Sequence, residues 1–165
     1  MFRRDSSRGQ SMVEFALVLP ILVLLLAGFF DLGRVVLGND ALSHAAREAA
    51  RYAVVHGGSP YNLCPVGPPA ADTVIPVAST ACPYPSPSKE SIRIEAREQA
   101  AAAGSTVTVE VCYGVNCVGD TDTGTNKRGT PITVTVYSTV NMVAGSLLGF
   151  PSFQVSSSST MLVNH

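Results

Sequence analysis

Residues 8–20 read Arg-Gly-Gln-Ser-Met-Val-Glu-Phe-Ala-Leu-Val-Leu-Pro and are the most informative stretch for the fold of the N-terminal part. The stretch joins a short basic leader to a long apolar run, and Glu14 is the last charged residue before that run. A carboxylate at the edge of a lipid core is unfavourable unless a partner neutralises it. Its position therefore points to a use for the acid in this segment.

The apolar run is long enough to cross a membrane. No charged residue occurs from Phe15 to Phe30. The 21 residues of Gln10–Phe30 would rise roughly 31 Å as a helix, which matches a bilayer core of about 30 Å. A cleaved secretory signal is disfavoured, because Leu25-Leu26-Ala27 lacks the required small residues. We expect a retained transmembrane segment at residues 10–31.

The flanking charges predict the orientation of this segment. Arg3, Arg4 and Arg8 precede it, with only Asp5 opposing them. The positive-inside rule then places the N-terminus in the cytoplasm and the residues after 31 on the other side of the membrane. The expected location is the cytoplasmic (inner) membrane of a single-pass protein. The net charge of −1 gives no indication of nucleic-acid binding.

The helix is predicted to continue well beyond the membrane, over residues 32–58. Apolar residues recur there at three- and four-residue spacing, as in an amphipathic helix, and Gly57-Gly58 is a suitable terminator. Gly33 and Gly38 should weaken this helix, and Pro20 should kink it within the membrane. The apolar stripe comprises Leu32, Val35, Val36, Leu42, Ala45, Ala46, Ala49, Tyr52 and Ala53.

Residues 59–165 are predicted to form a non-cytoplasmic α+β domain that opens with a proline-rich loop over residues 59–87. A second helix is expected at 88–103, with Ser88 as its N-cap and Gly104 as its end. Alternating apolar residues predict strands at 107–113, 132–140 and 153–163, and residues 141–150 read as a short helix or an irregular segment. The expected fold is a long N-terminal helix, a second helix and a small antiparallel sheet.

All four cysteines lie after the apolar run, at Cys64, Cys82, Cys112 and Cys117. Disulfides persist on the non-cytoplasmic side of a membrane, and four cysteines allow three connectivities. We expect local pairing, Cys64 with Cys82 and Cys112 with Cys117. A metal site is the rival interpretation, but the spacing of Cys112 and Cys117 is not typical of one. No cofactor or metal is expected, and no catalytic nucleophile–base arrangement is visible.

Three blocks of the first third of the chain carry a family resemblance. They are Gly-Gln-Ser-Met-Val-Glu-Phe-Ala-Leu-Val-Leu-Pro-Ile-Leu, then Phe-Phe-Asp-Leu-Gly-Arg, and then Ala-Ala-Arg-Glu-Ala-Ala-Arg-Tyr-Ala. Together they resemble the TadE-like family, pilin-like components of the tight-adherence (Flp) pilus machinery. The resemblance covers about residues 8–56.

The resemblance implies a prepilin-type leader over residues 1–9, cut by a prepilin peptidase between Gly9 and Gln10. Glu14 would then be the acid that pairs with the N-terminal amine of a neighbouring subunit during assembly, and Phe15 lies beside it in the assembly segment. The implied partners are the peptidase, the membrane, other pilin-like subunits in a homo- or hetero-oligomer, and the pilus assembly machinery.

Size separates this chain from the short major pilins of such systems, because more than 100 residues follow the membrane segment. The expected role is therefore a minor pilin or pseudopilin that supports pilus biogenesis and surface adhesion, in the membrane or in an extracellular pilus, and not an enzyme. The alternative is an uncleaved single-pass membrane protein with an extracytoplasmic binding or scaffold domain.

Overall fold

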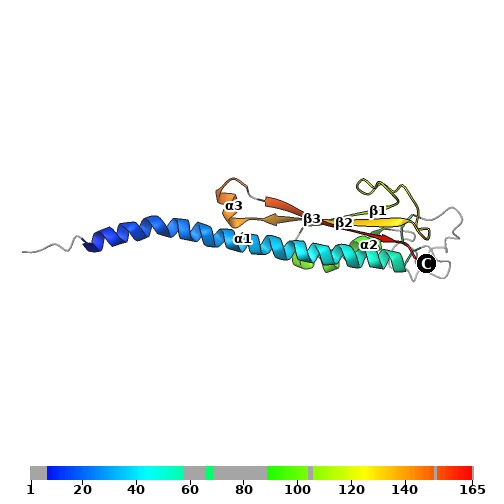
Figure 1. Ribbon diagram of the computed structural model, residues 1–165, viewed down its shortest axis with the longest axis horizontal. Helices are drawn as coiled ribbons and strands as arrows, with labels where there is room; N and C mark the ends of the chain where they lie inside the picture. Colours follow the sequence, from blue (N-terminus) through cyan, green and yellow to red (C-terminus); the bar gives the residue numbers. More distant parts are fainter. Residues whose placement is uncertain (1–6, 58–65, 69–88, 104–105, 151, 165) are drawn as a thin grey trace, which may run out of the picture.

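The computed structural model of the chain describes residues 7–57, 66–68, 89–103, 106–150 and 152–164. The elements follow in the order α1 (Ser7–Val55), α2 (Glu90–Gln99), the 3-10 helix η1 (Ala101–Ala103), β1 (Val107–Tyr113), β2 (Pro131–Asn141), α3 (Val143–Leu147) and β3 (Ser152–Leu162). This is the α+β fold expected from the sequence. Figure 1 shows that the first part of α1 projects away from a two-layer domain.

Helix α1 is continuous over 49 residues, about 74 Å at the rise of an α-helix. It runs through Gly33 and Gly38 without a break. Pro20 lies inside the helix, and the axis changes direction within the blue first part of α1 in Figure 1, which contains this proline. At the other end, the His56 backbone N–H donates to the Tyr52 carbonyl oxygen at 3.0 Å, so the helix closes before Gly57.

The sheet is antiparallel and has the strand order β1-β2-β3. Each observed strand agrees with its prediction to within one residue at either end. The register pairs Val111 with Val134 and Val134 with Ser159. Because side chains alternate along a strand, this register places the apolar side chains of β1 and β2 on one face and threonines on the other.

The second helix is shorter than the sequence predicted. Helix α2 covers Glu90–Gln99, and the alanines that follow form η1 rather than a further α-helical turn. The Ala103 backbone N–H donates to the Ala100 carbonyl at 2.8 Å, the i-to-i+3 bond of a tightened last turn. The Ser138 hydroxyl on β2 donates to the Ala103 carbonyl at 3.1 Å and holds this turn against the sheet. The predicted caps, Ser88 and Gly104, lie outside the described residues.

Helices α1 and α2 cover one face of the sheet (Figure 1). The contact face of α1 is built mainly from alanine, so the helix and the sheet approach closely; the Ser43 and Ser157 hydroxyl oxygens are 3.1 Å apart across this contact. Leu32 and Val36, predicted as part of the stripe, are exposed, whereas Val35 between them packs against the core. Fully buried residues of this layer are Leu42, Ala45, Ala46, Ala49, Ala50, Ala53, Ile92, Ala96, Val111, Ile132, Val134 and Val136.

A larger side chain on the alanine face should destabilise the domain. Ala49 is completely buried, and forcing extra methylenes into a close-packed contact typically costs about 1–3 kcal/mol. We expect Ala49→Leu to lower the thermal unfolding midpoint of the full chain in detergent, followed by circular dichroism. Glu48→Leu is the matched control, because Glu48 is exposed on the same helix. Equal midpoints for the two variants would contradict close packing at Ala49.

Candidate functional site

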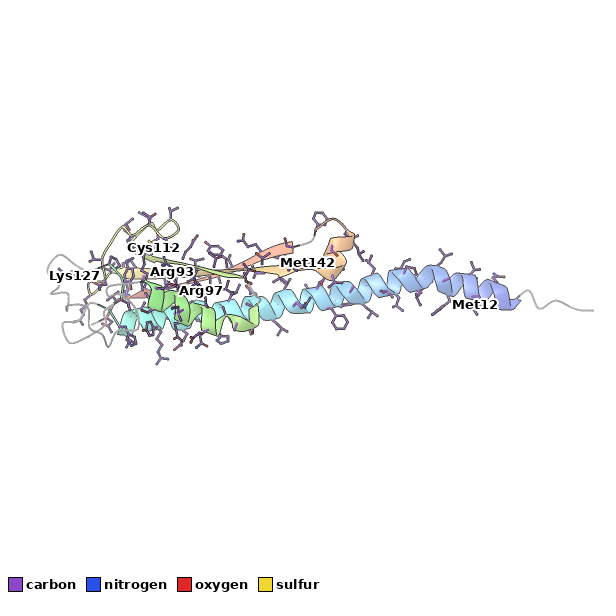
Figure 2. All side chains as sticks on the ribbon, turned by 180° about the vertical axis from the view of Figure 1, so that it is seen from behind. Met12, Arg93, Arg97, Cys112, Lys127 and Met142 are labelled. Carbon is purple, nitrogen blue, oxygen red and sulfur yellow. A yellow bond between two sulfur atoms is a disulfide. The ribbon has the colours of Figure 1, made fainter. Side chains whose placement is uncertain are left out.

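The first half of α1 presents apolar side chains to its surroundings on every side. None of its most apolar stretch is buried, and it is the one helix in the described residues that is long and apolar enough to cross a membrane. Met12, Phe15, Leu17 and Ile21 are each more than 60% exposed. Figure 2 shows Met12 far from the domain, toward the tip of this projecting segment. A surface of this size requires lipid or other apolar helices around it.

Gln10 and Glu14 lie on the same face of this helix, one turn apart. The Gln10 amide nitrogen Nε2 donates to Glu14 Oε1 at 3.3 Å, and Glu14 and Phe15 are both exposed. Apart from this bond, the carboxylate is available to a second group on its open side. Three of the predicted residues, Gln10, Glu14 and Phe15, are thus exposed close together near the start of α1.

Gly9 lies within the first turn of α1, exposed and with no heavy atom near the position that a Cβ would take. A peptidase acts on an extended backbone, so cleavage of the Gly9–Gln10 bond would require this first turn to open. The first four N–H groups of a helix have no partner within it, so opening the turn disrupts few hydrogen bonds.

A second feature of α1 lies where its apolar stretch ends. Asp31 is only 5% exposed, and its carboxylate accepts three backbone N–H groups at the start of α3. The bonds come from Val143 to Oδ1 (2.9 Å) and from Ala144 and Gly145 to Oδ2 (2.7 and 3.4 Å). These amides are the ones that a helix leaves without internal acceptors. Asp31 therefore joins α3 to α1.

The turn after α3 depends on a glycine. A Cβ added to Gly145 would fall on the carbonyl oxygen of Phe150 and on the Met142 side chain. The backbone N–H groups of Leu148 and Phe150 both donate to the Gly145 carbonyl, at 3.1 and 2.8 Å. Residues 142–150 thus fold back on themselves in a tight turn above Asp31.

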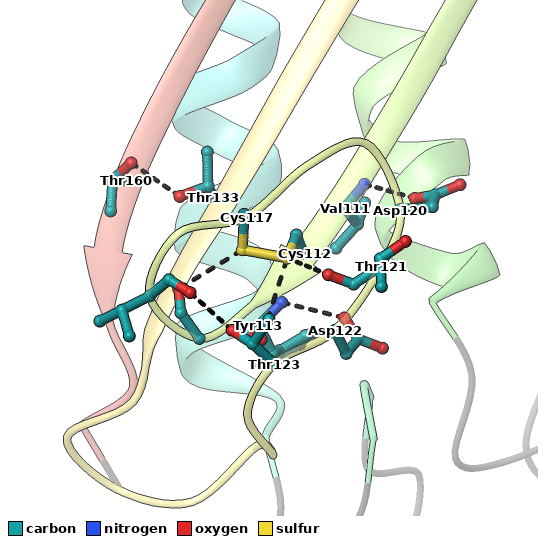
Figure 3. The surroundings of a disulfide bond; sticks show 12 residues. Val111, Cys112, Tyr113, Cys117, Asp120, Thr121, Asp122, Thr123, Thr133 and Thr160 are labelled. Carbon is teal, nitrogen blue, oxygen red and sulfur yellow. Dashed lines mark hydrogen bonds between the residues drawn. A yellow bond between two sulfur atoms is a disulfide. The ribbon is translucent and has the colours of Figure 1, made fainter.

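Among the described residues a disulfide joins Cys112 to Cys117, one of the two local pairings expected from the sequence (Figure 3). It lies at the end of the domain opposite the apolar segment of α1. The Cys112 sulfur lies 2.8 Å from the Thr121 carbonyl oxygen; a disulfide sulfur carries no proton, so this is a close contact rather than a hydrogen bond. Cys64 and Cys82 lie outside the described residues.

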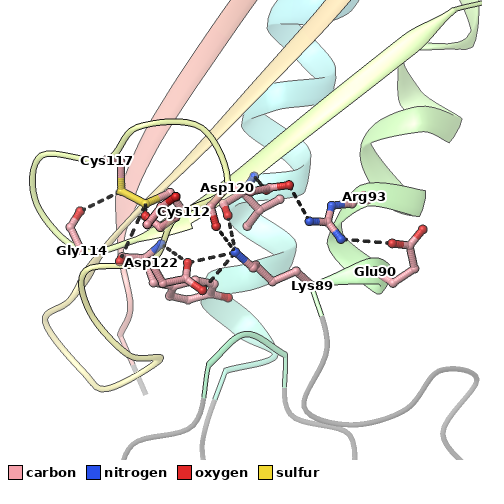
Figure 4. Close-up of polar contacts among 11 residues, drawn as sticks. Lys89, Glu90, Arg93, Cys112, Gly114, Cys117, Asp120 and Asp122 are labelled. Atoms are coloured by element: carbon pink, nitrogen blue, oxygen red, sulfur yellow. Dashed lines mark hydrogen bonds and ion pairs between the residues drawn. A yellow bond between two sulfur atoms is a disulfide. The ribbon is translucent and has the colours of Figure 1, made fainter.

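The loop after β1 carries two aspartates whose charges are neutralised within the domain (Figure 4). Asp120 accepts the Val111 backbone N–H at 2.7 Å and pairs with Arg93 at 2.7 Å. Asp122 accepts the Tyr113 backbone N–H at 3.0 Å and pairs with Lys89 at 3.0 Å. The two aspartates thus satisfy the backbone N–H groups of Val111 and Tyr113 on the outer edge of β1, where free groups could otherwise pair with another strand.

Arg93 is paired with two acidic residues, Glu90 and Asp120. Burial acts to lower the pKa of Arg93, but the charge of Asp120 and hydrogen bonds to Glu90 and Asp120 raise it overall. On the open face of the sheet, the hydrogen bond from the Tyr137 hydroxyl to Glu110 raises the pKa of Tyr137. In the part of the chain that the structure describes, no group of three or more His, Cys, Asp or Glu residues is placed to hold a metal ion.

Sequence reasoning did not identify Asp31 as a structural residue. The available signal was its position, because Asp31 is the first charge after 16 uncharged residues. Such an acid is unfavourable at a membrane boundary unless hydrogen-bonded, and the structure shows the bonds. Lys89 gave no comparable signal, since its acceptors on Val111, Asp120 and Asp122 lie at least 22 residues away.

Comparison with known proteins gives a family match for the N-terminal part of the chain. Residues 9–51 match the sequence model of the family described as TadE-like protein. Neither the search of curated proteins nor the search of solved structures gave a match. The matched range contains Gly9, Gln10, Glu14, Asp31 and most of the alanine face of α1. Over this range the chain is similar to TadE-like proteins, which confirms the resemblance noted in the sequence.

Proposed function

We propose that this chain is a pilin-like subunit, a minor pilin or pseudopilin, of a tight-adherence pilus system. In this proposal a prepilin peptidase removes residues 1–9, and the shortened chain joins other pilin-like subunits through α1. The N-terminus faces the cytoplasm and the domain lies outside the inner membrane. The TadE-like match and the apolar α1 indicate membrane anchoring, and the remaining steps are the proposal.

The observation that carries the proposal is the arrangement at the start of α1. An apolar helix surface, exposed all round, begins with Glu14 one turn after the predicted new N-terminus at Gln10. Within a bilayer, contacts of this surface with lipid can be replaced by contacts with the apolar helices of other subunits, so that its apolar area stays covered. Opposite charges in a region of low dielectric attract strongly and are unfavourable alone. Pairing Glu14 with a neighbour's α-amino group would neutralise both.

The amine of the same chain is a competing partner for Glu14. Gln10 and Glu14 are four residues apart, about 6 Å along the helix axis, and side chains on a helix tilt toward its N-terminus. After cleavage, Glu14 would face its own α-amino group before assembly and a neighbour's amine afterwards. Assembly would then replace an intramolecular contact by intermolecular ones, in which each subunit's Glu14 receives the amine of the next.

The alternative function is an uncleaved single-pass scaffold protein. One structural observation favours it: α1 already begins at Ser7, so the Gly9–Gln10 bond lies within a helical turn. The two functions differ at this bond.

Intact-mass analysis separates the two functions. Co-expression with the cognate prepilin peptidase should remove residues 1–9 from the wild-type chain and leave Gly9→Leu at full length, because leucine is too large for a pocket that accepts glycine. Gly28→Leu is the control, since Gly28 lies on α1 away from the bond and should leave cleavage unaffected. A wild-type chain that stays at full length beside a processed substrate of the same peptidase would support the scaffold alternative.

A further inference from the structure

The turn between β2 and β3 is apolar, exposed and uncharged. Four of its side chains, Val143, Leu147, Leu148 and Phe150, are more than half exposed, as is Phe153 at the start of β3. No Asp, Glu, Lys or Arg occurs from Asn141 to the end of the sequence. Turns at the surface of soluble domains are normally polar, so this one is suited to a different environment. These residues, 143–150 and 153, are named here the apolar foot.

The apolar foot lies at the level where the membrane segment of α1 ends. Asp31 holds α3 against α1 through three backbone N–H groups. A groove of about 590 Å³ lies beside this contact. It is lined by Gly28, Asp31, Leu32 and Val35 of α1 and by residues of the foot such as Leu148 and Phe153. Figure 1 shows α3 at the end of the domain that faces the projecting part of α1, and Figure 2 places Met142 at the same end.

The surface of the foot is continuous with that of the membrane segment. Phe29, Phe30 and Leu32 of α1 are all more than 60% exposed at the height of the groove. Arg34, the first basic residue after the apolar run, is exposed one turn beyond Phe30. A cation in this position suits the phosphate layer of a membrane, while the apolar side chains below it suit the acyl chains.

We propose that the apolar foot inserts into the lipid bilayer, in the leaflet on the domain's side. Val143, Leu147, Leu148 and Phe150 enter the boundary between head groups and acyl chains, and lipid chain segments fill the groove. The occupant is lipid rather than a second copy of the chain, because the surface continues that of the spanning helix at the same depth and carries no charge. The foot and α1 then fix how the domain stands on the membrane.

The proposal rests on α1 crossing the membrane and on neither cleavage at Gly9 nor pilus assembly. Its test can therefore use the uncleaved Gly9→Leu chain as well as the wild type. Lipid contact in both chains would support the foot even if the chain proved to be an uncleaved scaffold protein, so the two proposals fail independently.

The absence of tryptophan from the chain allows a direct measurement. Phe150→Trp introduces a single tryptophan in the foot, which can be excited selectively over the tyrosines. Val118→Trp is the matched control, because Val118 is 79% exposed in the loop beside the Cys112–Cys117 disulfide. Both full-length variants are reconstituted into phosphatidylcholine vesicles, with and without brominated acyl chains. Tryptophan at Phe150 should emit at shorter wavelength than at Val118, be quenched strongly by the brominated lipid and be protected from aqueous iodide.

Two results would overturn the proposal. The first is identical emission and iodide quenching of the two variants, which would place the foot in water. The second is blue-shifted emission at Phe150 that brominated lipid does not quench and that disappears at low protein-to-lipid ratio, which would identify a second copy as the partner. Leu147→Trp, 75% exposed at the end of α3, provides an independent probe and should respond as Phe150→Trp does.

Discussion

Glu14→Ala should insert into the membrane as the wild type does and fail to join other subunits. The substitution removes a charge from the edge of an already apolar helix, which eases insertion. It also leaves the neighbour's α-amino group without a counter-charge at the edge of a low-dielectric region, where an unpaired ion is strongly unfavourable. We expect the amount of assembled subunit to fall by about tenfold or more.

The measurement compares the amount of each variant in the membrane fraction with the amount that associates with other subunits. Tagged and untagged copies of the chain are co-expressed with the pilus machinery, and untagged chain is quantified after affinity capture and in filaments sheared from the cell surface. Glu14→Gln keeps a side chain that can bond to Gln10 but has no charge, and Glu14→Asp keeps the charge on a shorter side chain. The alanine and glutamine variants should both fail, and the aspartate variant should retain part of the association.

The glutamine variant is decisive for the role of charge. Wild-type association by Glu14→Gln would show that hydrogen bonding alone suffices and that the ion pair with a neighbour's amine is wrong. Reduced membrane level of Glu14→Ala would instead assign Glu14 to insertion. The cleavage state of each variant is measured by intact mass, so that an assembly defect is distinguished from a processing defect.

Asp31→Ala should release α3 and the apolar foot from α1 while leaving the rest of the domain folded. The substitution removes the acceptor of three backbone N–H groups, and hydrogen bonds to a charged group are among the stronger ones in proteins. Helix α3 has no side-chain cap from its own N-cap residue, and the Asp31 carboxylate supplies the acceptors for its first amides. The alanine face of α1 packs on the sheet further toward the C-terminal end of the helix, and Asp31 is not part of that core. The core should therefore stay folded in the variant.

Hydrogen exchange of the full chain in nanodiscs measures this release. The amides of Val143 and Ala144 should lose protection by about tenfold or more, and those of the central residues of β2 should be unchanged. Asp40→Ala is the matched control, since Asp40 is an exposed acid on the same helix. Asp31→Asn keeps one acceptor oxygen and should lie between the two. Unchanged protection of α3 in Asp31→Ala would show that the turn holds its place without Asp31.

Loss of the Asp31 contact also bears on the foot. If α3 separates from α1, the foot is no longer held at the level of Leu32 and Val35. Phe150→Trp in the Asp31→Ala background should therefore show a broader emission and weaker quenching by brominated lipid than in the wild-type background. Equal quenching in the two backgrounds would mean that the apolar side chains of the foot insert into the bilayer without the Asp31 contact.

Much of the fold could be predicted because it follows from local periodicity. Alternation of Val107, Val109 and Val111 defines one strand, and three- and four-residue spacing of the alanines defines the face of α1 that packs on the sheet. Prediction failed where a tertiary contact changed a local preference. The alanine run after Gln99 has strong helix propensity, yet Ala101–Ala103 tighten into η1, whose last carbonyl is bound by Ser138.

The candidate assembly segment was also readable from the sequence, since leader, glycine, acid and apolar run lie within one short stretch. The sequence by itself determined the long helix, the strands and the position of Glu14 beside Gln10. Only the tertiary structure decided the role of Asp31, whose partner Val143 is 112 residues away, and the use of Asp120 and Asp122 to satisfy the edge of β1. The physical reason is that periodicity reports which face of an element is buried, whereas the partner of a buried charge is set by how distant elements pack.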